Sequence, residues 1–464
     1  MRRPLLVIAA AVVAALLSGP APASAAVHTK TYDFPVSMEP FQVLQKIDFV
    51  ERPNVDGFIT GMSVNVVNAD GSPVPIQRLM LHHIVFAAPG VNRTCNSFTG
   101  FDNRTINSNY GEVFYGAGEE RNVLVLPKGY GYPISKVSNP VFAKWGMVWM
   151  FMNHRGVSDH AFIRYTVQWD DSKNLKPVHP YWLDVRNCHA DPVYDVPGNG
   201  AKGSVFQQRY QFRMPEGGVI VGGGGHVHGG GKSLVVSEPD CGNRTVYKST
   251  PAWGMPDHPF YNVRPILHEP GPISMSGMLS EKGYPIAKGQ RIRLTSNYDG
   301  SRPHTRVMGI SLFFLAPDPS VKGCPPPPKD ILNLQPAAIR GEKFRTEPPV
   351  FKVPLTGIDP KTGKAVEIDR PPGATVAKKD GATISVGNYF FGPANVSLPL
   401  GSTLNWRFNS STLHNVTLAN GPRGFSSPNL NDSRRFSFKF RKPGTYRIFC
   451  GLHPVSMTET VTVK

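Results

Sequence analysis

The chain has 464 residues, a formal net charge of +17, 46 glycines and 45 prolines. The positive charge does not indicate nucleic-acid binding, because the lysines and arginines are scattered rather than gathered in one stretch. Beyond the N-terminus no apolar run approaches the roughly 18 residues that cross a bilayer, so we expect no membrane span. Short runs rich in valine, isoleucine, phenylalanine, tyrosine and threonine predict an all-β protein built from antiparallel β-sandwiches.

The first 25 residues have the pattern of a secretory signal peptide. A short basic start, M-R-R, precedes an apolar run, and Ala23-Ser24-Ala25 is a small-x-small cleavage site. Arg2-Arg3 also resembles a twin-arginine export signal, although the basic start is too short to decide between the two. We therefore predict a secreted protein, extracellular or periplasmic, whose signal peptide covers residues 1–25.

The remaining chain divides by composition into four segments. Residues 28–169 and 170–317 alternate strands with turns and predict two tandem antiparallel β-sandwiches. Residues 318–381 are rich in proline, lysine and glycine and predict a semi-rigid linker, part of which can pack on a neighbour. Residues 382–464 return to short strands and predict a third, smaller sandwich with its own core.

The number of cysteines is odd. An exported protein with five cysteines is expected to use one of them for another purpose than a disulfide, and Cys450 is the obvious exception. The other four are predicted to form two disulfides, whose pairing the sequence does not reveal: Cys95, Cys188, Cys241 and Cys324.

The C-terminal segment contains the strongest chemical pattern. His414 lies in T-L-H-N-V-T-L, and Cys450, His453 and Met457 follow together in F-C-G-L-H-P-V-S-M. One thiolate, two imidazoles and a weak thioether are the donors of a blue-copper electron-transfer site. The alternative is a buried free cysteine near a chance histidine, which the order of the donors disfavours. In this order of donors the segment 382–464 resembles the plastocyanin-like cupredoxins, which implies a Greek-key β-sandwich with one type 1 copper.

The residue after Cys450 is Gly451, and the chain contains no H-C-H triplet. Multicopper oxidases and copper nitrite reductases connect their blue copper to a second site through a histidine beside the cysteine. An electron that leaves the predicted blue-copper centre must therefore cross a domain interface.

A second pattern surrounds His226 and His228, in V-I-V-G-G-G-G-H-V-H-G-G-G-K-S-L. Residues two apart on a strand share one face at a spacing of about 6.6 Å, so both imidazoles can bind one metal ion. The alternative is a glycine-rich loop with two solvated histidines. A phosphate-binding loop is a weaker interpretation, because no G-x-G-x-x-G or G-K-[ST] pattern opens a helix here.

Four further positions are ambiguous when each is taken alone. His82 and His83 lie in L-M-L-H-H-I-V-F, and because adjacent strand residues point to opposite faces, both can bind one ion only where the strand bulges or ends. A core histidine beside a surface histidine is the structural alternative. His154 ends an apolar run, and Met308 would ordinarily fill a core. The other histidines are interpreted as surface or core residues: His160, His179, His189, His258, His268 and His304.

Together these positions follow the order H-H, H-R-G, H-V-H and then a methionine at the start of a closing strand. In this order, residues 35–317 resemble the copper type II, ascorbate-dependent monooxygenases, the family of peptidylglycine α-hydroxylating monooxygenase and dopamine β-monooxygenase. Nod19-like proteins share the glycine-framed pattern G-G-G-G-H-x-H-G-G-G. The resemblance implies two jelly-roll-like sandwiches with one mononuclear, type 2-like copper each. The implied ligands are His82, His83 and His154 for an electron-transfer copper, and His226, His228 and Met308 for an oxygen-activating copper.

The resemblance implies a secreted monooxygenase that hydroxylates a C–H bond with O2. It would use up to three coppers per chain, an unknown organic substrate, and an external reductant or redox partner, while the cupredoxin supplies or relays electrons. Gly224 and Leu312 stand where the peptide-amidating enzymes carry an arginine and a tyrosine, which argues against a peptidylglycine substrate. The alternative is a non-catalytic electron-transfer protein in which only the cupredoxin is redox active.

Overall fold

The computed structural model describes residues 27–90, 93–94, 110–140, 142–186, 192–334 and 342–464. These residues form strands, loops and two short 3-10 turns, η1 (Pro239–Cys241) and η2 (Pro259–Tyr261), so the prediction of an all-β protein is confirmed. No helix in the described part of the chain is long and apolar enough to span a membrane. The predicted signal peptide lies outside the described residues.

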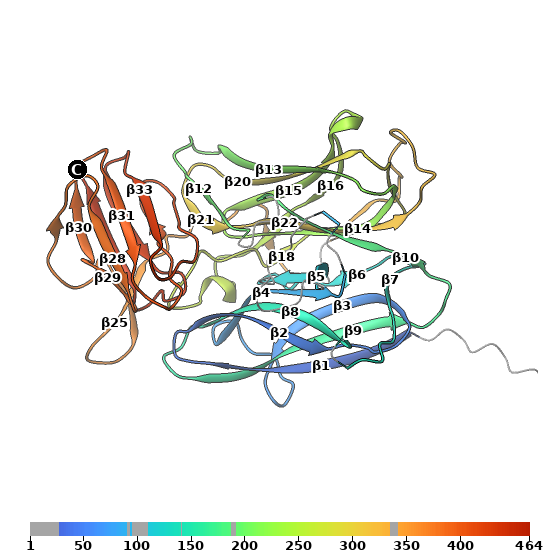
Figure 1. Ribbon diagram of the computed structural model, residues 1–464, viewed down its shortest axis with the longest axis horizontal. Coiled ribbons are helices and arrows are strands. Elements are labelled where there is room, and N and C mark those ends of the chain that lie inside the picture. Colours follow the sequence, from blue (N-terminus) through green and yellow to red (C-terminus); the bar gives the residue numbers. More distant parts are fainter. Residues whose placement is uncertain (1–26, 91–92, 95–109, 141, 187–191, 335–341) are drawn as a thin grey trace, which may run out of the picture.

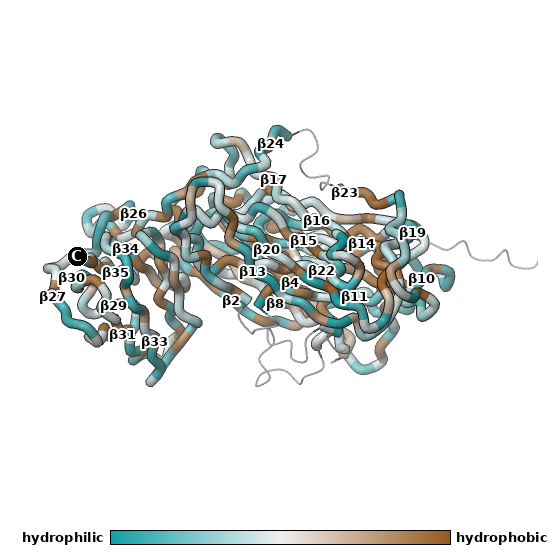
Figure 2. Tube along the Cα trace, turned by 90° about the horizontal axis from the view of Figure 1, so that it is seen from above, coloured by the Kyte–Doolittle hydropathy of each residue, from teal (hydrophilic) through white to brown (hydrophobic). Residues whose placement is uncertain are grey.

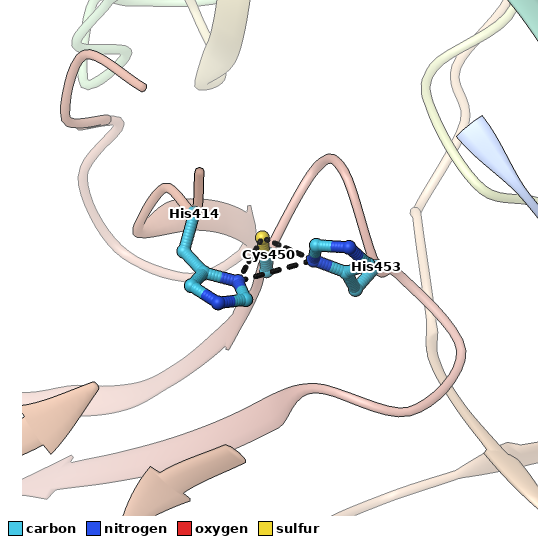
Figure 3. A group of neighbouring side chains, drawn as sticks. All are labelled: His414, Cys450 and His453. Atoms are coloured by element: carbon cyan, nitrogen blue, oxygen red, sulfur yellow. Dashed lines mark hydrogen bonds between the residues drawn. The ribbon is translucent and has the colours of Figure 1, made fainter. Parts of the chain in front are cut away.

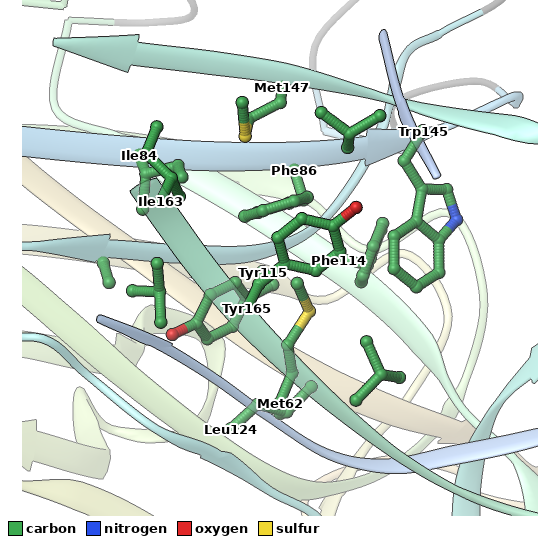
Figure 4. Close-up of a cluster of buried hydrophobic side chains, with 14 of the residues drawn as sticks. Met62, Ile84, Phe86, Phe114, Tyr115, Leu124, Trp145, Met147, Ile163 and Tyr165 are labelled. Atoms are coloured by element: carbon green, nitrogen blue, oxygen red, sulfur yellow. The ribbon is translucent and has the colours of Figure 1, made fainter. Parts of the chain in front are cut away.

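The first sandwich packs a six-stranded sheet against a four-stranded sheet, and an aromatic core fills the space between them (Figure 4). Phe86, Phe114 and Trp145 of the smaller sheet meet Tyr165 of the larger sheet in this core. The six-stranded sheet contains β1 (Val27–Met38), β9 (Asp159–Asp170), β3 (Gly57–Val67), β7 (Tyr130–Ile134), β10 (Lys176–Pro177) and β6 (Leu124–Val125). The four-stranded sheet contains β2 (Val43–Glu51), β8 (Lys144–Asn153), β4 (Leu79–Ala88) and β5 (Glu112–Gly118).

The second sandwich packs a five-stranded sheet against a four-stranded sheet around its own core. The five-stranded sheet contains β11 (His179–Asp184), β22 (Gly309–Pro317), β14 (Gly218–Val227), β19 (Gly277–Ile286) and β23 (Leu332–Leu334). The four-stranded sheet contains β13 (Val205–Arg213), β20 (Arg291–Asp299), β15 (Gly231–Glu238) and β16 (Arg244–Ser249). Two small sheets lie beside them, one of β12 (Tyr194–Val196) and β21 (His304–Val307), the other of β18 (Ser274–Met275), β17 (Pro251–Gly254) and β24 (Phe344–Arg345).

The first two sandwiches share an apolar interface, and Figure 1 shows β4, β5 and β8 facing β14 and β22 across it. Val221, Phe314 and Ala316 of the second sandwich pack into the core of the first. A further cluster contains residues of both sandwiches: Ala87, Tyr110, Val113, Val148, Trp182, Met308 and Ile310. Because such an interface resembles a core rather than a transient contact, we expect the two sandwiches to move little against each other.

The third sandwich forms a separate stack of strands at one end of the molecule (Figures 1 and 2). Its strands alternate inward apolar residues with exposed polar ones, as in β33 (Arg435–Lys439), where Phe436 and Phe438 alternate with exposed Arg435 and Lys439. One sheet contains β27 (Val376–Ala377), β30 (Asn395–Leu398), β35 (Thr458–Val463), β34 (Gly444–Phe449) and β32 (Thr417–Asn420). The other contains β29 (Phe390–Gly392), β28 (Thr383–Gly387), β31 (Thr403–Phe408) and β33 (Arg435–Lys439).

The segment predicted as a linker adds strands to its neighbours. Within it, β23 and β24 extend sheets of the second sandwich, and β27 pairs with β30 of the third. A hairpin of β25 (Leu355–Ile358) and β26 (Ala365–Ile368) lies between them. A disulfide joins Cys241 to Cys324 and fixes the start of this segment. Cys450 is free and buried, while Cys95 and Cys188 lie outside the described residues.

Candidate metal centres

The first candidate centre lies in the third sandwich, at the end of β34. Cys450 follows β34 directly, His453 and Met457 lie on the loop that leads into β35, and His414 precedes β32. Figure 3 shows both imidazoles turned toward the Cys450 sulfur. The Nδ1 atoms of His414 and His453 lie 3.1 Å apart, and they lie 3.9 and 3.6 Å from Sγ. Three donor atoms from two separate loops therefore face one point.

Backbone hydrogen bonds shape the loop that carries these donors. The amide of His453 donates to the carbonyl of Cys450 at 2.9 Å, and the amide of Met457 donates to the carbonyl of His453 at 3.1 Å. The amide of Cys450 in turn donates to the carbonyl of Met457 at 2.9 Å. Met457 is fully buried in the same core cluster as Cys450, and this closed loop brings its backbone next to that of Cys450.

Asn415 supports the sulfur from the side of β32. Its amide donates to the Cys450 sulfur at 3.4 Å, and its side-chain oxygen accepts hydrogen bonds from the Gly451 amide at 2.7 Å and the Thr417 hydroxyl at 2.9 Å. An N–H donor aimed at sulfur stabilises the thiolate form that binds a metal. Asn415 therefore couples the His414 loop to the Cys450 loop.

The protonation states suit a soft cation. Burial raises the pKa of the Cys450 thiol, and hydrogen bonds from Asn415, Leu452 and His453 oppose this increase. Burial lowers the pKa of His414, and burial together with His414 lowers the pKa of His453 to about 4. The metal-free centre therefore holds a thiol and two neutral imidazoles at neutral pH, and a metal ion can replace the thiol proton. This donor set fits copper in both of its common oxidation states.

The second candidate centre lies between the first two sandwiches. His82 and His83 come from β4 of the first sandwich, and His226 and His228 come from the end of β14 in the second. The ring centroids of His82 and His228 lie 5.1 Å apart, and those of His226 and His228 lie 5.0 Å apart. The structure thus gathers in one cluster four histidines that the resemblance divides between two separate ions. We call this group, with its neighbours Glu119, Glu120 and His268, the central cluster.

An irregularity in β4 explains how two adjacent histidines join the central cluster. The pairing of β4 with β8 changes register between Leu81 and His83, and the Nδ1 atoms of His82 and His83 lie only 3.2 Å apart. A bulge redirects one side chain toward the face of its neighbour. From the sequence we expected both histidines to bind one ion only where the strand bulges or ends, and the structure shows this irregularity in β4.

Glu120 orients His226. Its Oε1 lies 3.0 Å from Nδ1 of His226 and also accepts hydrogen bonds from the Gly118 amide at 3.1 Å and the Asn122 side chain at 2.9 Å. Gly118 makes room for this contact, because a Cβ there would lie 2.5 Å from Glu120 and 2.6 Å from the His226 ring. The Nε2 atoms of His226 and His228 are buried and have no hydrogen-bond partner among the described residues. A carboxylate on one ring nitrogen and an unpartnered second nitrogen are features of metal-binding histidines.

The Tyr298 hydroxyl joins His228 to Met308. It accepts a hydrogen bond from the His228 amide at 2.8 Å and donates one to the Met308 carbonyl at 2.6 Å. Strands β14 and β22 place Val227 opposite Gly309, and the same register continued by one residue places Met308 opposite His228. Met308 is buried and belongs to the apolar interface between the sandwiches.

His154 makes no ring contact with His82 or His83 among the described residues. In the described part of the chain, the ring contacts of His82 are with His83, His228 and His268. The Nδ1 atom of His154 instead lies 3.1 Å from the Pro265 carbonyl, and its buried Nε2 has no partner among the described residues. Burial, followed by the charge of His268, lowers the pKa of His154 to about 4.

Sequence reasoning missed Glu119, Glu120 and His268. His268, interpreted above as a surface or core residue, lies with its ring centroid 5.1 Å from that of His82, and its Nε2 lies 2.6 Å from Glu119 Oε1. Donor atoms of His82, Glu119 and His268 all lie within 4.8 Å of one another. The available signal was the pair of adjacent carboxylates directly after a strand, in G-A-G-E-E-R.

Electrostatics favour a cation in the central cluster. Burial, followed by neighbouring imidazoles, lowers the pKa of both His82 and His228. Burial also lowers the pKa of His226, but Glu120 outweighs burial and the net shift is upward. Burial raises the pKa of Glu119, yet His268 and His82 outweigh burial, so that this pKa falls to about 2. The cluster therefore keeps the buried Glu119 carboxylate ionised.

A cavity of about 790 Å³ adjoins both centres. The central cluster forms one part of its wall, and Gly451 and Leu452, which follow Cys450, form another. Gly224 opens into free space, because a Cβ there would meet no atom within 4 Å. Most of the wall is apolar, with contributions from all three sandwiches, including Val148, Trp182, Met278, Leu279, Ile310, Phe314, Leu418 and Phe449.

The third sandwich is fixed beside this cavity by polar contacts with the second. Asp195 accepts hydrogen bonds from the Ser426 amide at 2.7 Å and the Arg306 amide at 3.0 Å. The Thr305 hydroxyl donates to the Leu418 carbonyl at 2.8 Å. These contacts involve β12 and β21, and β21 leads directly to Met308. The docking surface and the central cluster therefore share one short stretch of chain.

Comparisons with known proteins match two parts of the chain. Residues 150–318 match the family model described as Stress up-regulated Nod 19. A purple cupredoxin from Nitrosopumilus maritimus is 33% identical over 18% of this chain and 99% of that chain, with a TM-score of 0.17. An oxidised amicyanin variant is 21% identical over 18% of this chain and 80% of that chain, also with a TM-score of 0.17. A comparison with curated proteins finds no match. The matched stretch 150–318 contains His154, His226, His228, His268 and Met308.

Proposed function

We propose that the chain is a secreted copper-dependent monooxygenase that hydroxylates a C–H bond with O2, and that its third sandwich is a blue-copper domain that supplies or relays electrons. The observation that carries this proposal is the position of the central-cluster histidines on one largely apolar cavity, whose wall also includes Gly451 and Leu452 of the Cys450 loop. A protein that only stores electrons has no need of an apolar cavity beside unpartnered imidazoles. An enzyme that binds an organic substrate needs both.

The proposed reaction balances with an external reductant. O2 and a C–H bond, with two electrons and two protons, give a C–OH group and water; O2 is reduced, and the substrate and the donor are oxidised. Bound copper would supply the one-electron chemistry that lets O2 react with a C–H bond. The chain orients the donors for this ion, since Glu120 fixes the ring of His226 and Tyr298 fixes His228 beside Met308.

The cavity supports a neutral and mainly apolar substrate. Gly224 leaves open the space where a charged side chain would bind a substrate carboxylate. Among the charged lining residues, Glu269 is engaged by His304 at 2.6 Å and by Arg302 at 2.7 Å. Arg306 donates to the Ser427 carbonyl at 2.9 Å. Because Glu269 and Arg306 already have partners within the protein, we expect substrates to be selected by shape and apolar contact.

A chain of bonds and hydrogen bonds offers a route for electrons between the two centres. From the Cys450 sulfur it passes to the Asn415 amide at 3.4 Å and along the chain to Val416. The Val416 carbonyl accepts from the Ser427 amide at 2.8 Å, and the Ser427 carbonyl accepts from Arg306 at 2.9 Å. Two residues after Arg306 the chain reaches Met308. This route replaces the covalent connection that Gly451 excludes.

Metal counting with EPR tests the proposal before any substrate is known. The copper-loaded full-length chain should contain, besides one ion with the spectrum of a type 1 centre, further copper with the spectrum of type 2 centres. After reduction with ascorbate, exposure to O2 should reoxidise the copper of the central cluster. His226→Ala should slow this reoxidation, and His179→Ala, a control in a histidine–carboxylate pair at a sheet edge, should not.

The second candidate is a non-catalytic electron-transfer protein. It is favoured by one observation: the Cys450 centre draws all its donors from the third sandwich and needs nothing from the other two. A fully loaded chain that contains only the blue copper would support this candidate and exclude the monooxygenase. Normal reoxidation by O2 in His226→Ala would also count against the monooxygenase.

We also propose that the chain is exported. The disulfide between Cys241 and Cys324 supports an oxidising compartment, where such bonds persist. Detection of the mature chain outside the cytoplasm, with an N-terminus after residue 25, would test this.

A further inference from the structure

A buried carboxylate connects the first two sandwiches at the central cluster. Glu119 follows β5 of the first sandwich, His82 comes from β4, and His268 lies in the loop after η2 of the second sandwich. Glu119 Oε1 lies 2.6 Å from Nε2 of His268 and 3.8 Å from Nε2 of His82. The other oxygen, Oε2, accepts a hydrogen bond from the Gly271 amide at 3.0 Å. One oxygen is therefore fixed by the backbone, and the other is shared by two imidazoles.

The buried Glu119 carboxylate needs a compensating cation. Glu119 is 6% exposed and His82 is 8% exposed, and a buried carboxylate is costly unless a cation compensates its charge. Donor atoms of His82, Glu119 and His268 all lie within 4.8 Å of one another, so one metal ion bound by all three would compensate this charge.

We propose that His82, Glu119 and His268 form a metal site that joins the first two sandwiches. Two imidazole nitrogens and one carboxylate oxygen select a divalent first-row transition ion, copper or zinc. The site deepens the proposed function, since it replaces the ligand set of His82, His83 and His154 that the resemblance implies for the first copper. In this ligand set His268, from the second sandwich, takes the place that the resemblance gives to His154.

The position of this site has two consequences. The His82 ring lies 5.1 Å from that of His228, so an ion here would be a close neighbour of an ion held by His226 and His228. The donors also come from both sides of the interface, so the ion would stabilise the contact between the two sandwiches. Because an ion that binds only the folded state stabilises that state, chelation should lower the melting temperature.

Metal binding by variants of the full-length chain tests the proposal. The chain would be loaded separately with Cu²⁺ and with Zn²⁺, dialysed, and analysed for bound metal, and competition with a chelator would give affinities. Glu119→Gln and His268→Ala should each lose one ion or bind it at least tenfold more weakly. Glu269→Gln is a matched control, because Glu269 is a partly buried carboxylate that also lies 2.6 Å from a histidine and lines the same cavity. It should retain the ion, as should His154→Ala.

Thermal unfolding of the metal-free variants reports whether the first two sandwiches still fold, because the Cys450 centre reports only on the third. If a variant does not fold, X-ray absorption of the zinc-loaded natural chain replaces it, with two imidazoles and a carboxylate expected at one zinc site. Three imidazoles without a carboxylate, or an ion lost in His154→Ala but kept in Glu119→Gln and His268→Ala, would overturn the proposed site.

The outcomes also separate this site from the proposed function. If an ion is lost in His226→Ala while Glu119→Gln and His268→Ala bind metal like the natural chain, only the proposed site fails. If the natural chain binds metal at Cys450 alone, the site and the monooxygenase both fail.

Discussion

The Cys450 centre and the central cluster are built in opposite ways. The donors of the Cys450 centre lie between residues 414 and 457, and one hydrophobic core supports all of them. The central cluster joins residues from His82 to His268, and the first two sandwiches must meet before its donors are close. A change in the docking of the sandwiches should therefore disturb the central cluster and leave the Cys450 centre intact.

The two regions also differ in the pKa of a buried glutamate, Glu119 in the central cluster and Glu459 in the third sandwich. Glu119, between His82 and His268, has its pKa lowered to about 2, because the imidazoles outweigh burial. Glu459 lies in the third sandwich, where burial raises its pKa to about 8 and the Trp406 side chain, at 2.8 Å, opposes this only in part. The central cluster thus compensates the negative charge of its buried carboxylate, whereas the surroundings of Glu459 in the third sandwich do not.

The largest effect is expected from removing the thiolate. Cys450→Ser should abolish the intense visible absorption and remove one copper per chain, because a hydroxyl is not deprotonated at neutral pH as a metal-bound thiol is. The central cluster should keep its metal and its reoxidation by O2 when a chemical reductant is supplied. Absorption spectroscopy and metal analysis measure both. Visible absorption that persists in Cys450→Ser would contradict the assignment of the centre.

The two centres also differ in how far the sequence predicts them. The spacing of His414, Cys450 and His453 indicated the first centre because its donors follow one another on two loops of one sandwich. The second was indicated only in part, by His226 and His228, whose spacing on a strand is itself a local pattern.

Residues that reach a site from different elements carry no such pattern. Glu119 and His268 are 149 positions apart and meet only because the loop after η2 lies against the end of β5. His154 was grouped with His82 by resemblance, but its ring turns toward the Pro265 carbonyl instead. The all-β fold was predictable because alternation of apolar and polar residues is local, while the register change in β4 depends on its pairing with β8.

A second prediction uses pH to sharpen the difference between the buried glutamates. Because the pKa of Glu459 is about 8 in the folded chain and 4.5 is its usual value, the unfolded chain loses this proton first. The contribution of Glu459 to stability is therefore fully present below pH 4.5 and is lost as pH rises toward 8, by about 3 kcal/mol at pH 7.

Glu459→Gln removes this titration and keeps an acceptor for Trp406. We expect the stability of the variant, relative to the natural chain, to increase between pH 5 and pH 8. Denaturant unfolding of the metal-free proteins at each pH measures the difference. A difference that does not change with pH would show that Glu459 titrates alike in both states.

The third prediction breaks the central cluster without touching a proposed ligand. Glu120→Gln removes the carboxylate that orients His226, so the metal affinity of this cluster should fall 10- to 100-fold, about 1.4 to 2.7 kcal/mol. The spectrum of the Cys450 centre should not change. Glu216→Gln is the control, because Glu216 makes a similar contact, 2.7 Å, with His179 but does not line the cavity. Equal affinities in Glu120→Gln and the natural chain would remove Glu120 from the site.

The smallest effect is expected at the contact between the third sandwich and the rest. Asp195→Asn replaces one of two acceptor oxygens with a donor that faces the amides of Ser426 and Arg306, so docking should weaken by about 1 kcal/mol. Each centre should keep its own metal and spectrum, because neither draws donors from Asp195. Electron transfer from a reduced Cys450 centre to the central cluster should nevertheless slow, since the route through Ser427 and Arg306 depends on this contact. Stopped-flow reoxidation would detect the change, and an unchanged rate would mean that electrons reach the central cluster by another path.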